Sequence, residues 1–388
     1  MTSGAGAVQE LVLVGGGHSH ALALRSLALQ SVTGVRTTLV SPARHTPYSG
    51  MLPGLVAGHY RFEESHIDLL RLCRWAGVRF VAGRVVALDP QARRLTLRDG
   101  SAIAYDVVSI DIGSQPELDA VPGARQHAVP VKPVAGLWQR WQAVYARLQA
   151  QPAGARDYRI AVVGGGAGGV ELAMAMAARL AGRGVRVALW CAGPVILQGY
   201  NACARRAVQR ALARLEVAVQ VDARVARVRP GSLLLADGRG ADYDELFWCT
   251  GAAAAPWVAA SGLRTDASGF LQVRDTLQTV DDDRVFAAGD IAAQVAHPRP
   301  KAGVYAVRQA PVLTHNLRAA LLGEPLREYR PQRSFLSLVS LGGKRATAAR
   351  GPCSATGAWV WRWKDRIDRA FMARFTDLPA GPVRDRAL

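Results

Sequence analysis

Two short glycine-rich stretches have the residue types that hold a phosphate group. The first, GGGHSH, follows a short apolar run and places Gly15 and Gly17 two positions apart. The second, GGGAGG, carries Gly164, Gly166 and Gly169 after a similar run. Glycine lets the backbone approach a pyrophosphate, and the N–H groups and dipole of a following helix stabilise its negative charge. Each stretch therefore predicts a dinucleotide-binding loop between a buried strand and a helix.

His20 stands where the first loop should have its third glycine, a position that the second loop keeps as Gly169. That glycine normally serves close packing of the helix on the strand. We therefore expect the first loop to keep its turn and its phosphate approach through Gly15 and Gly17. His20 either widens the packing or points its imidazole toward the phosphates, and we favour packing.

The plan around the first loop is repeated around the second. The segments LTLRDGSAIAYDVVSIDIGS (95–114) and LLLADGRGADYDELFWCTGA (233–252) align without a gap, with seven identities in twenty positions, and include Gly113 and Gly251 as an identical pair. Each copy has a strand, a glycine turn, an apolar-periodic helix, a second strand and hairpins closed by Asp-Gly turns. Two loops in register with a repeated downstream block indicate two related nucleotide-binding folds.

Length and cysteine content limit the class of protein. The 388 residues, half of them hydrophobic, can bury a large core in two or three domains. The start MTSGAGAVQE lacks the features of a signal peptide, and no apolar run reaches about 18 residues, so we expect a cytoplasmic protein. The five cysteines include no C-x-x-C pair, so we expect neither a disulfide framework nor a metal site.

The formal net charge of +18 is carried almost wholly by arginine. It either reflects codon usage or attracts polyanions such as dinucleotides and acidic lipid headgroups. We do not expect nucleic acid as a partner, and a homodimer stays open. The charge also allows a nucleotide-binding sensor or a polyanion-binding protein with little turnover.

These motifs resemble the two-dinucleotide-fold flavoproteins, the pyridine nucleotide-disulfide oxidoreductase superfamily, along nearly the whole chain. The resemblance implies an α/β fold in which the first loop binds FAD and the second, in an inserted domain, binds NADH or NADPH. VFAAGD resembles a second FAD motif, in which Gly289 and Asp290 meet the ribityl or pyrophosphate region; a turn or helix-cap aspartate is the alternative. Arg308, Gln309 and Ala310 would lie beside the flavin pyrimidine, although Arg308 also suits a solvated helix face.

The absence of a cysteine pair limits which subfamily the chain resembles. Disulfide reductases carry a C-x4-C pair after the second strand, but residues 41–60 contain no cysteine. The scheme that fits is hydride transfer from NAD(P)H to FAD and then to a diffusible acceptor such as a quinone, as in type II NADH dehydrogenases. The strongest resemblance is to the NADH dehydrogenase-like module often fused ahead of selenide, water dikinase, and we expect the module to stand alone here. Through GGGHSH and RHTPYSGMLPG it implies cofactor contacts for His18, Arg44 and Pro53.

The chain departs from that pattern at several positions. Related proteins often have an acidic residue that holds a ribose, whereas this chain has Ser41 there in the first fold and Cys191 in the second. The preference for NADH or NADPH therefore stays open. Two glutamines of quinone-reducing members correspond to Val304 and Arg308, whereas Gln309 is kept. This weakens the quinone assignment.

A sulfur- or selenium-oxidising flavoprotein of the sulfide:quinone oxidoreductase type is an alternative. That chemistry needs a nucleophilic cysteine pair near the flavin. Cys249 lies on an apolar strand and Cys353 precedes the last helix, and each alone is more often a small packing residue.

Near the C-terminus, aromatic and apolar residues recur every four positions among arginines; they are Trp359, Trp363, Ile367, Phe371 and Phe375. This spacing predicts a helix with one slowly drifting apolar stripe. The helix either lies on an acidic membrane surface on the inner side of the cell membrane, packs on the FAD domain, or forms a dimer contact.

Two charged residues are candidates for the reacting centre. By the resemblance, Glu171 points toward the junction of flavin and nicotinamide, and Lys364 faces the acceptor site. The alternative for Glu171 is a favourable interaction with the helix dipole.

We therefore expect an FAD domain over residues 1–118 and 278–332, a linker and helix over 119–156, and an NAD(P)H domain over 157–277. A short C-terminal region with the amphipathic helix follows at 333–388. The expected activity is that of an FAD-dependent NAD(P)H dehydrogenase without a redox disulfide.

Overall fold

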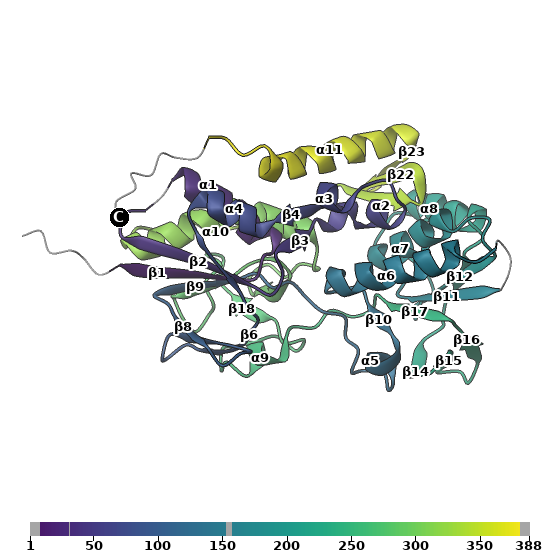
Figure 1. The fold of residues 1–388 in the computed structure, drawn as a ribbon, viewed down its shortest axis with the longest axis horizontal. Helices are drawn as coiled ribbons and strands as arrows, with labels where there is room; N and C mark the ends of the chain where they lie inside the picture. The colour runs from purple at the N-terminus through teal and green to yellow at the C-terminus, as the bar shows by residue number, and fades with distance from the viewer. Residues whose placement is uncertain (1–7, 31, 153–156, 381–388) are drawn as a thin grey trace, which may run out of the picture.

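Two five-stranded parallel sheets form the framework of the computed structural model, which describes residues 8–30, 32–152 and 157–380 (Figure 1). The first sheet consists of β19 (Val285–Ala287), β9 (Val107–Ile110), β1 (Gln9–Val14), β2 (Val35–Ser41) and β5 (Arg79–Ala82), in that order. The second consists of β10 (Val129–Pro130), β17 (Glu245–Trp248), β11 (Tyr158–Val163), β12 (Val185–Trp190) and β13 (Ala218–Gln220). The expected α/β class with two dinucleotide-binding folds is confirmed. Residues 1–7, on which the expectation of no signal peptide partly depends, lie outside the described residues.

The first glycine loop follows the central strand of the first sheet. Val14, the last residue of β1, lies beside Val40 and Ile110 of the neighbouring strands. Because the strands are parallel, their carboxyl ends meet at one edge, and the loop lies there. Alternate residues of β1 enter two different cores: Leu11 and Leu13 pack with helices α1 (His18–Leu29), α4 (Leu69–Ala76) and α10 (Gly303–Leu322), and Val12 and Val14 pack on the opposite face. Burial on both faces explains the continuous apolar run.

The second sheet repeats this arrangement. Ile160 and Val162 of β11 pack with helices α6 (Val134–Gln149), α7 (Ala167–Arg179) and α8 (Ala202–Arg214). Ala161 and Val163 face a second, smaller core. The glycine loop between β11 and α7 therefore lies at the edge of its sheet in the same way as the first.

The sequence repeat is also present in the structure, as two small antiparallel sheets of the same kind. They consist of β6 (Val85–Asp89), β7 (Arg94–Leu97) and β8 (Ala102–Ala104), and of β14 (Val225–Arg229), β15 (Ser232–Leu235) and β16 (Gly240–Asp242). Each contains a register shift near its start, between Val85 and Ala87 in the first sheet and between Val225 and Arg227 in the second. The equivalent irregularity shows that the repeat extends to the detail of strand pairing.

The structure assigns two segments differently from the expected domain bounds. Residues 119–156, expected as linker and helix, supply β10 to the second sheet and α6 to its core. Residues 256–273, expected in the second domain, form α9 (Pro256–Ala259) and β18 (Leu271–Val273), and Val258 and Leu271 pack in a core of the first sheet. β18 pairs with β20 (Ala292–Gln294). Apolar patterning identifies such elements but does not say which sheet they cover.

The C-terminal part forms a three-stranded antiparallel sheet and one long helix. The elements are β21 (Ser337–Leu341), β22 (Gly343–Arg350), β23 (Cys353–Gly357) and α11 (Ala358–Thr376). In Figure 1, α11 runs along one side of the molecule, from β22 and β23 beside the second sheet to the helices of the first. It therefore spans both halves.

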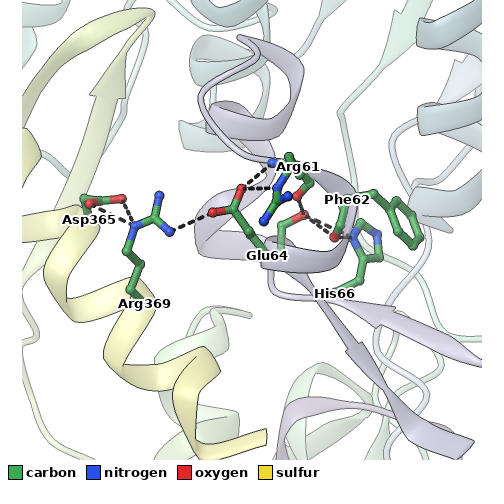
Figure 2. A network of polar contacts seen from close by, with 7 residues as sticks. Arg61, Phe62, Glu64, His66, Asp365 and Arg369 are labelled. Carbon is green, nitrogen blue, oxygen red and sulfur yellow. Dashed lines mark hydrogen bonds and ion pairs between the residues drawn. The ribbon is translucent and has the colours of Figure 1, made fainter. Parts of the chain in front are cut away.

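Polar contacts join α11 to the segment between β2 and α4 of the first fold. This segment contains β3 (His45–Pro47), α2 (Leu52–Val56), α3 (Phe62–Ser65) and β4 (His66–Asp68). Figure 2 shows Arg369 of α11 between Asp365, one turn earlier, and Glu64 of α3, to which its Nη1 donates at 2.9 Å. Glu64 also accepts from the backbone N–H of Arg61 at 2.7 Å. One carboxylate thus links the start of α3 to α11.

The apolar stripe of α11 divides into two parts. Phe371 and Phe375 are buried in the core with α1 and α4, as expected for packing on the first fold. Trp359, Trp363 and Ile367 are 53%, 41% and 39% exposed. A four-residue spacing exceeds the helical repeat of 3.6 residues, so the stripe drifts from solvent into the core along the helix.

Candidate active site

The first glycine loop is packed against the end of β9. A Cβ on Gly15, whose φ is +91°, or on Gly17 would collide with Asp111. The backbone N–H of Gly17 donates to the Asp111 carbonyl at 3.1 Å. The cap position of α1 is Gly17, which supplies no side-chain hydrogen bond to the helix. The loop therefore brings bare backbone to the N-terminus of α1, as phosphate binding requires.

His20 has the packing role that the sequence favours. Its side chain is fully buried, and its Nδ1–H donates to the Gly15 carbonyl at 2.7 Å. With that tautomer, Nε2 accepts from the Ser109 hydroxyl at 2.8 Å. Burial lowers the pKa of His20 to about 4, so the ring is neutral at physiological pH. In the second loop a Cβ on Gly169 would instead collide with the Gly164 carbonyl.

Replacing His20 by glycine is expected to lower the free energy of unfolding by about 3 kcal/mol, because it leaves a cavity and an unpaired Ser109 hydroxyl. The FAD affinity of the folded variant should be unchanged. Denaturant unfolding and flavin-fluorescence titration measure the two quantities. A weakened flavin affinity at unchanged stability would contradict the packing role.

The VFAAGD motif places Asp290 beside Lys132, a residue that the sequence analysis did not single out. Burial opposes ionisation of Asp290, but the Lys132 ammonium at 2.9 Å and the Ser114 hydroxyl at 3.0 Å hold its pKa below the usual value. Gly289, with a φ of +70°, donates its N–H to the Gln309 side chain at 2.7 Å. The motif is thereby tied to α10.

Helix α10 presents the three predicted flavin-side residues differently. Gln309 and Ala310 are buried, whereas Arg308 is exposed, as in a solvated helix face. A flavin contact for Arg308 therefore loses support and stays a prediction. The Ser19 hydroxyl donates to the Ala306 carbonyl at 2.9 Å, which joins the starts of α1 and α10.

The remaining predicted residues of the first fold already have protein partners. The Ser41 hydroxyl donates to the Ala43 carbonyl at 2.9 Å, and Arg44 pairs with Asp68 at 2.6 Å. Pro53 is buried in the first turn of α2. His18 donates from Nε2 to the Pro47 carbonyl at 3.2 Å, and burial is the main cause of its lowered pKa. Their cofactor contacts stay predictions.

The second loop leaves an open helix N-terminus. Gly164 has a φ of +135°, and Gly166, the cap position of α7, has no atom within 4 Å of where a Cβ would lie. α7 has no side-chain cap, so its first N–H groups are available to a phosphate. Cys191 packs beneath the loop and donates to the Val195 carbonyl at 3.5 Å. It thus faces its own loop rather than offering a ribose contact.

The two charged candidates for the reacting centre meet at the contact between α7, β21 and α11. Burial raises the pKa of Glu171 to about 7, against the lowering effects of the Lys364 charge and of the Ser340 N–H, which donates to it at 2.6 Å. Lys364 is only 6% exposed and donates to Asp368 and to the Gly50 carbonyl, both at 2.5 Å. Burial raises the pKa of Asp368. The result is an acid–base group in which the buried Lys364–Asp368 pair interacts electrostatically with the half-buried Glu171.

Two hollows lie beside these elements. One, of about 120 Å³, is lined by residues that include Gly289, Asp290, Lys301, Tyr305 and Gln309. The other, of about 680 Å³, lies between the loop before α8, the residues after β20 and the C-terminal sheet; its charged lining residues are Arg299, Arg333 and Arg350. Glycine turns, helix starts whose cap residue is glycine, and a paired Asp290 fit FAD on the first fold and a nicotinamide dinucleotide on the second.

Two such folds in one chain, each with its own glycine loop, define a two-dinucleotide-fold flavoprotein. The chain belongs to the pyridine nucleotide-disulphide oxidoreductase family, whose model matches residues 9–310. The expected oxidoreductase class and the pairing of FAD with a nicotinamide dinucleotide are thereby confirmed at the level of the family. The expected resemblance to type II NADH dehydrogenases is confirmed by the names of relatives.

Three comparisons describe those relatives. An NADH dehydrogenase-like protein of Mycobacterium tuberculosis is 31% identical over 225 residues, which are 56% of each chain. The chain thus spans little more than half of that relative. Demethylphylloquinone reductase of Synechocystis is 26% identical over 84% of this chain and 83% of its own. The solved structure of sulfide:quinone oxidoreductase from Aquifex aeolicus has a TM-score of 0.78 at 19% identity, covering 97% of this chain and 93% of its own, and shows a shared fold.

Sequence reasoning missed three polar residues of this region. Asp111, Lys132 and Asp368 each contact a predicted site residue. Signals existed for the first two: Asp111 lies in the repeated block opposite Cys249, and Lys132 is one of four lysines in the chain. Asp368 is one of two aspartates in α11 and has no distinguishing pattern.

Proposed function

We propose that this protein passes a hydride from a nicotinamide dinucleotide to FAD and then reduces a quinone, without a redox disulfide. The observation that carries the proposal is the placement of Glu171 on α7 and the buried Lys364–Asp368 pair on α11, whose charges interact beside β21. The names of the relatives support a nicotinamide donor and, for one of them, a quinone acceptor.

FAD, when bound, supplies a two-electron carrier that accepts a hydride and returns the electrons to the acceptor. The residues of this chain provide position and charge. Gly17 and Gly166 open the two helix starts to phosphate, and Asp290, held ionised by Lys132, accepts hydrogen bonds from hydroxyl groups. The ammonium of Lys364 can donate a proton to a reduced acceptor, and Glu171, poised near neutral pH, can resupply it.

The sulfur or selenium alternative has less support from the cysteines. Cys249 lies at the end of β17, where burial raises the pKa of its thiol, and Cys353 is exposed on β23 in another sheet. A buried thiol with a raised pKa is a poor nucleophile. The sulfide:quinone oxidoreductase comparison shows the fold alone. The resemblance to the module fused to selenide, water dikinase stays a prediction.

Anaerobic stopped-flow absorbance tests the proposal. NADH or NADPH should bleach the yellow protein within seconds or faster. A short-chain quinone should then restore the oxidised spectrum. Parallel runs with each nicotinamide decide the donor, and runs with oxygen, sulfide and selenide compare the acceptors. Very slow bleaching combined with tight, salt-sensitive binding to DNA or acidic vesicles would overturn the proposal in favour of a sensor.

We further propose that α11 lies on an acidic membrane surface. The exposed residues Trp359, Trp363 and Ile367 stand beside the exposed cations Arg362 and Arg366, which suits the boundary between headgroups and acyl chains. Within the described ranges, no helix is both long enough and apolar enough to span a bilayer. Cytoplasmic placement on the inner face of the membrane and a homodimer both stay predictions.

Replacing Trp359 and Trp363 together by serine is expected to reduce binding to phosphatidylglycerol-containing vesicles about tenfold or more, because each indole loses its burial at the interface. Vesicle co-sedimentation at low salt measures the loss. Val295→Ser, which removes a 55% exposed apolar side chain elsewhere, is the control and should bind like the wild type. Equal binding of both variants would exclude α11 as the contact, and a smaller particle in gel filtration would indicate a dimer contact instead.

A further inference from the structure

A buried carboxyl group lies directly beneath the first glycine loop. Asp111 is 2% exposed and stands at the carboxyl end of β9. Its Oδ2 accepts from the backbone N–H of His20, in the first turn of α1, at 3.1 Å, and its Oδ1 lies 2.5 Å from where a Cβ on Gly289 would be. It therefore touches both glycine motifs and lies beneath the helix end that a pyrophosphate should approach.

The charged groups around Asp111 do not neutralise it. His18 on α1 is the nearest titratable cation, but burial lowers its pKa. The ring of His20 is directed away, to Gly15 and Ser109, and is neutral. Asp290 adds a like charge, and Lys132 is engaged in its pair with Asp290. Two carboxylates and one paired lysine thus leave a net negative charge at this helix start.

Burial and the Asp290 charge raise the pKa of Asp111 to about 6, although the His20 N–H and the His18 ring favour its ionised form. A diphosphate placed at the same helix start would add further negative charge beside this carboxyl group. A nearby like charge disfavours ionisation of a carboxyl group further. The neutral form also gains an O–H that can donate to a phosphate oxygen.

The second fold supplies an internal comparison. In the gapless alignment of the repeat, Cys249 occupies the position of Asp111, and it packs against Gly164 and Gly169 in the same way. The nicotinamide-binding loop therefore has a neutral side chain where the flavin-binding loop has an acid. The difference is specific to the fold that holds FAD.

We propose that Asp111 is a further cofactor-site residue, which takes up one proton when FAD binds and faces the pyrophosphate as a neutral carboxyl group. The proton comes from solvent, and no covalent bond changes. This assignment rests on FAD binding to the first fold and is independent of which acceptor the enzyme reduces.

The coupling between proton uptake and FAD binding determines how the FAD affinity depends on pH. The apoprotein loses the Asp111 proton above about pH 6, whereas the complex keeps it, so FAD binding must recover the proton at higher pH. The dissociation constant should therefore rise toward tenfold per pH unit between about pH 6.5 and 8. FAD itself changes no charge in that range, so the proton uptake reports on the protein.

Calorimetric titration of flavin-stripped protein with FAD, in two buffers of different ionisation enthalpy near pH 7.5, measures the uptake directly. Wild type should take up close to one proton per FAD. Asp111→Asn should take up none, and its affinity should be independent of pH. Asp99→Asn, which removes an exposed carboxylate in a hairpin of the same half, is the matched control and should behave like wild type.

His18→Gln separates the two titratable neighbours. It should retain the proton uptake if Asp111 is the acceptor. Absence of proton uptake in the wild type overturns the assignment, as does loss of the uptake in His18→Gln. If Asp111→Asn does not bind FAD, Asp111→Cys, which copies the residue of the second fold, takes its place. The proposal requires that its FAD affinity be independent of pH. A pH-dependent affinity in Asp111→Cys would contradict the proposal.

Discussion

Replacing Gly17 by valine yields a colourless protein. A side chain at this position collides with Asp111 and fills the approach of the pyrophosphate to α1, so FAD binding should fall below detection. The absorbance spectrum of the purified variant, with flavin released by heat and quantified, measures the loss. Circular dichroism checks that the fold is retained.

Gly166→Val is the matched variant on the second loop. A Cβ at Gly166 meets open space, so the substitution should leave the fold and the bound flavin intact. The added side chain still blocks the diphosphate of the nicotinamide dinucleotide, so NADH should no longer bleach the yellow protein. A Gly17→Val protein that retains stoichiometric FAD would refute the assignment of the two loops.

Replacing Lys364 by methionine is expected to slow reoxidation of the reduced protein by quinone by about 10²-fold, while reduction by the nicotinamide proceeds at nearly the wild-type rate. The lysine is the proposed proton donor on the acceptor side, and its removal leaves Asp368 and Glu171 without their cation. Without that charge the pKa of Glu171 should rise further. The pH profile of reoxidation should therefore shift upward, which a purely structural role of Lys364 would not produce.

Lys344→Met is the control for that experiment. Lys344 lies on β22 of the same C-terminal region, above the Trp361 ring, and is exposed. It should leave both half-reactions unchanged. Because Asp368 loses its cation in Lys364→Met, the double variant with Asp368→Asn distinguishes a loss of stability from a loss of proton transfer. Unchanged reoxidation in Lys364→Met would exclude the lysine from the reaction.

The glycine loops and the strands and helices beside them could be predicted from local sequence. Gly15, Gly17, Gly164 and Gly166 lie between buried strands and helix starts, since glycine, apolar runs and helix periodicity act over neighbouring residues. The motif that contains Asp290 was instead recognised by its resemblance to a family motif. The repeat strengthened the prediction of the two glycine loops, because two copies of one pattern support each other.

Contacts between distant segments could not be predicted in the same way. Lys132 reaches Asp290 across 158 residues, and Lys364 reaches Gly50 across 314. The membership of α6 in the second core depends on packing partners that the amphipathic pattern does not name. The drift of the α11 stripe was visible in its spacing, but only its neighbours decide which part is buried.

The equivalent bulges in the two small hairpin sheets bear on the origin of the molecule. A bulge gives up regular ladder pairing and persists within a family as an inherited feature. Its presence near the start of β6 and again near the start of β14 indicates that both halves descend from one ancestral unit that was duplicated. The hairpin scaffold thus kept even its irregularity in both halves, whereas the residues beneath the two glycine loops, Asp111 and Cys249, differ.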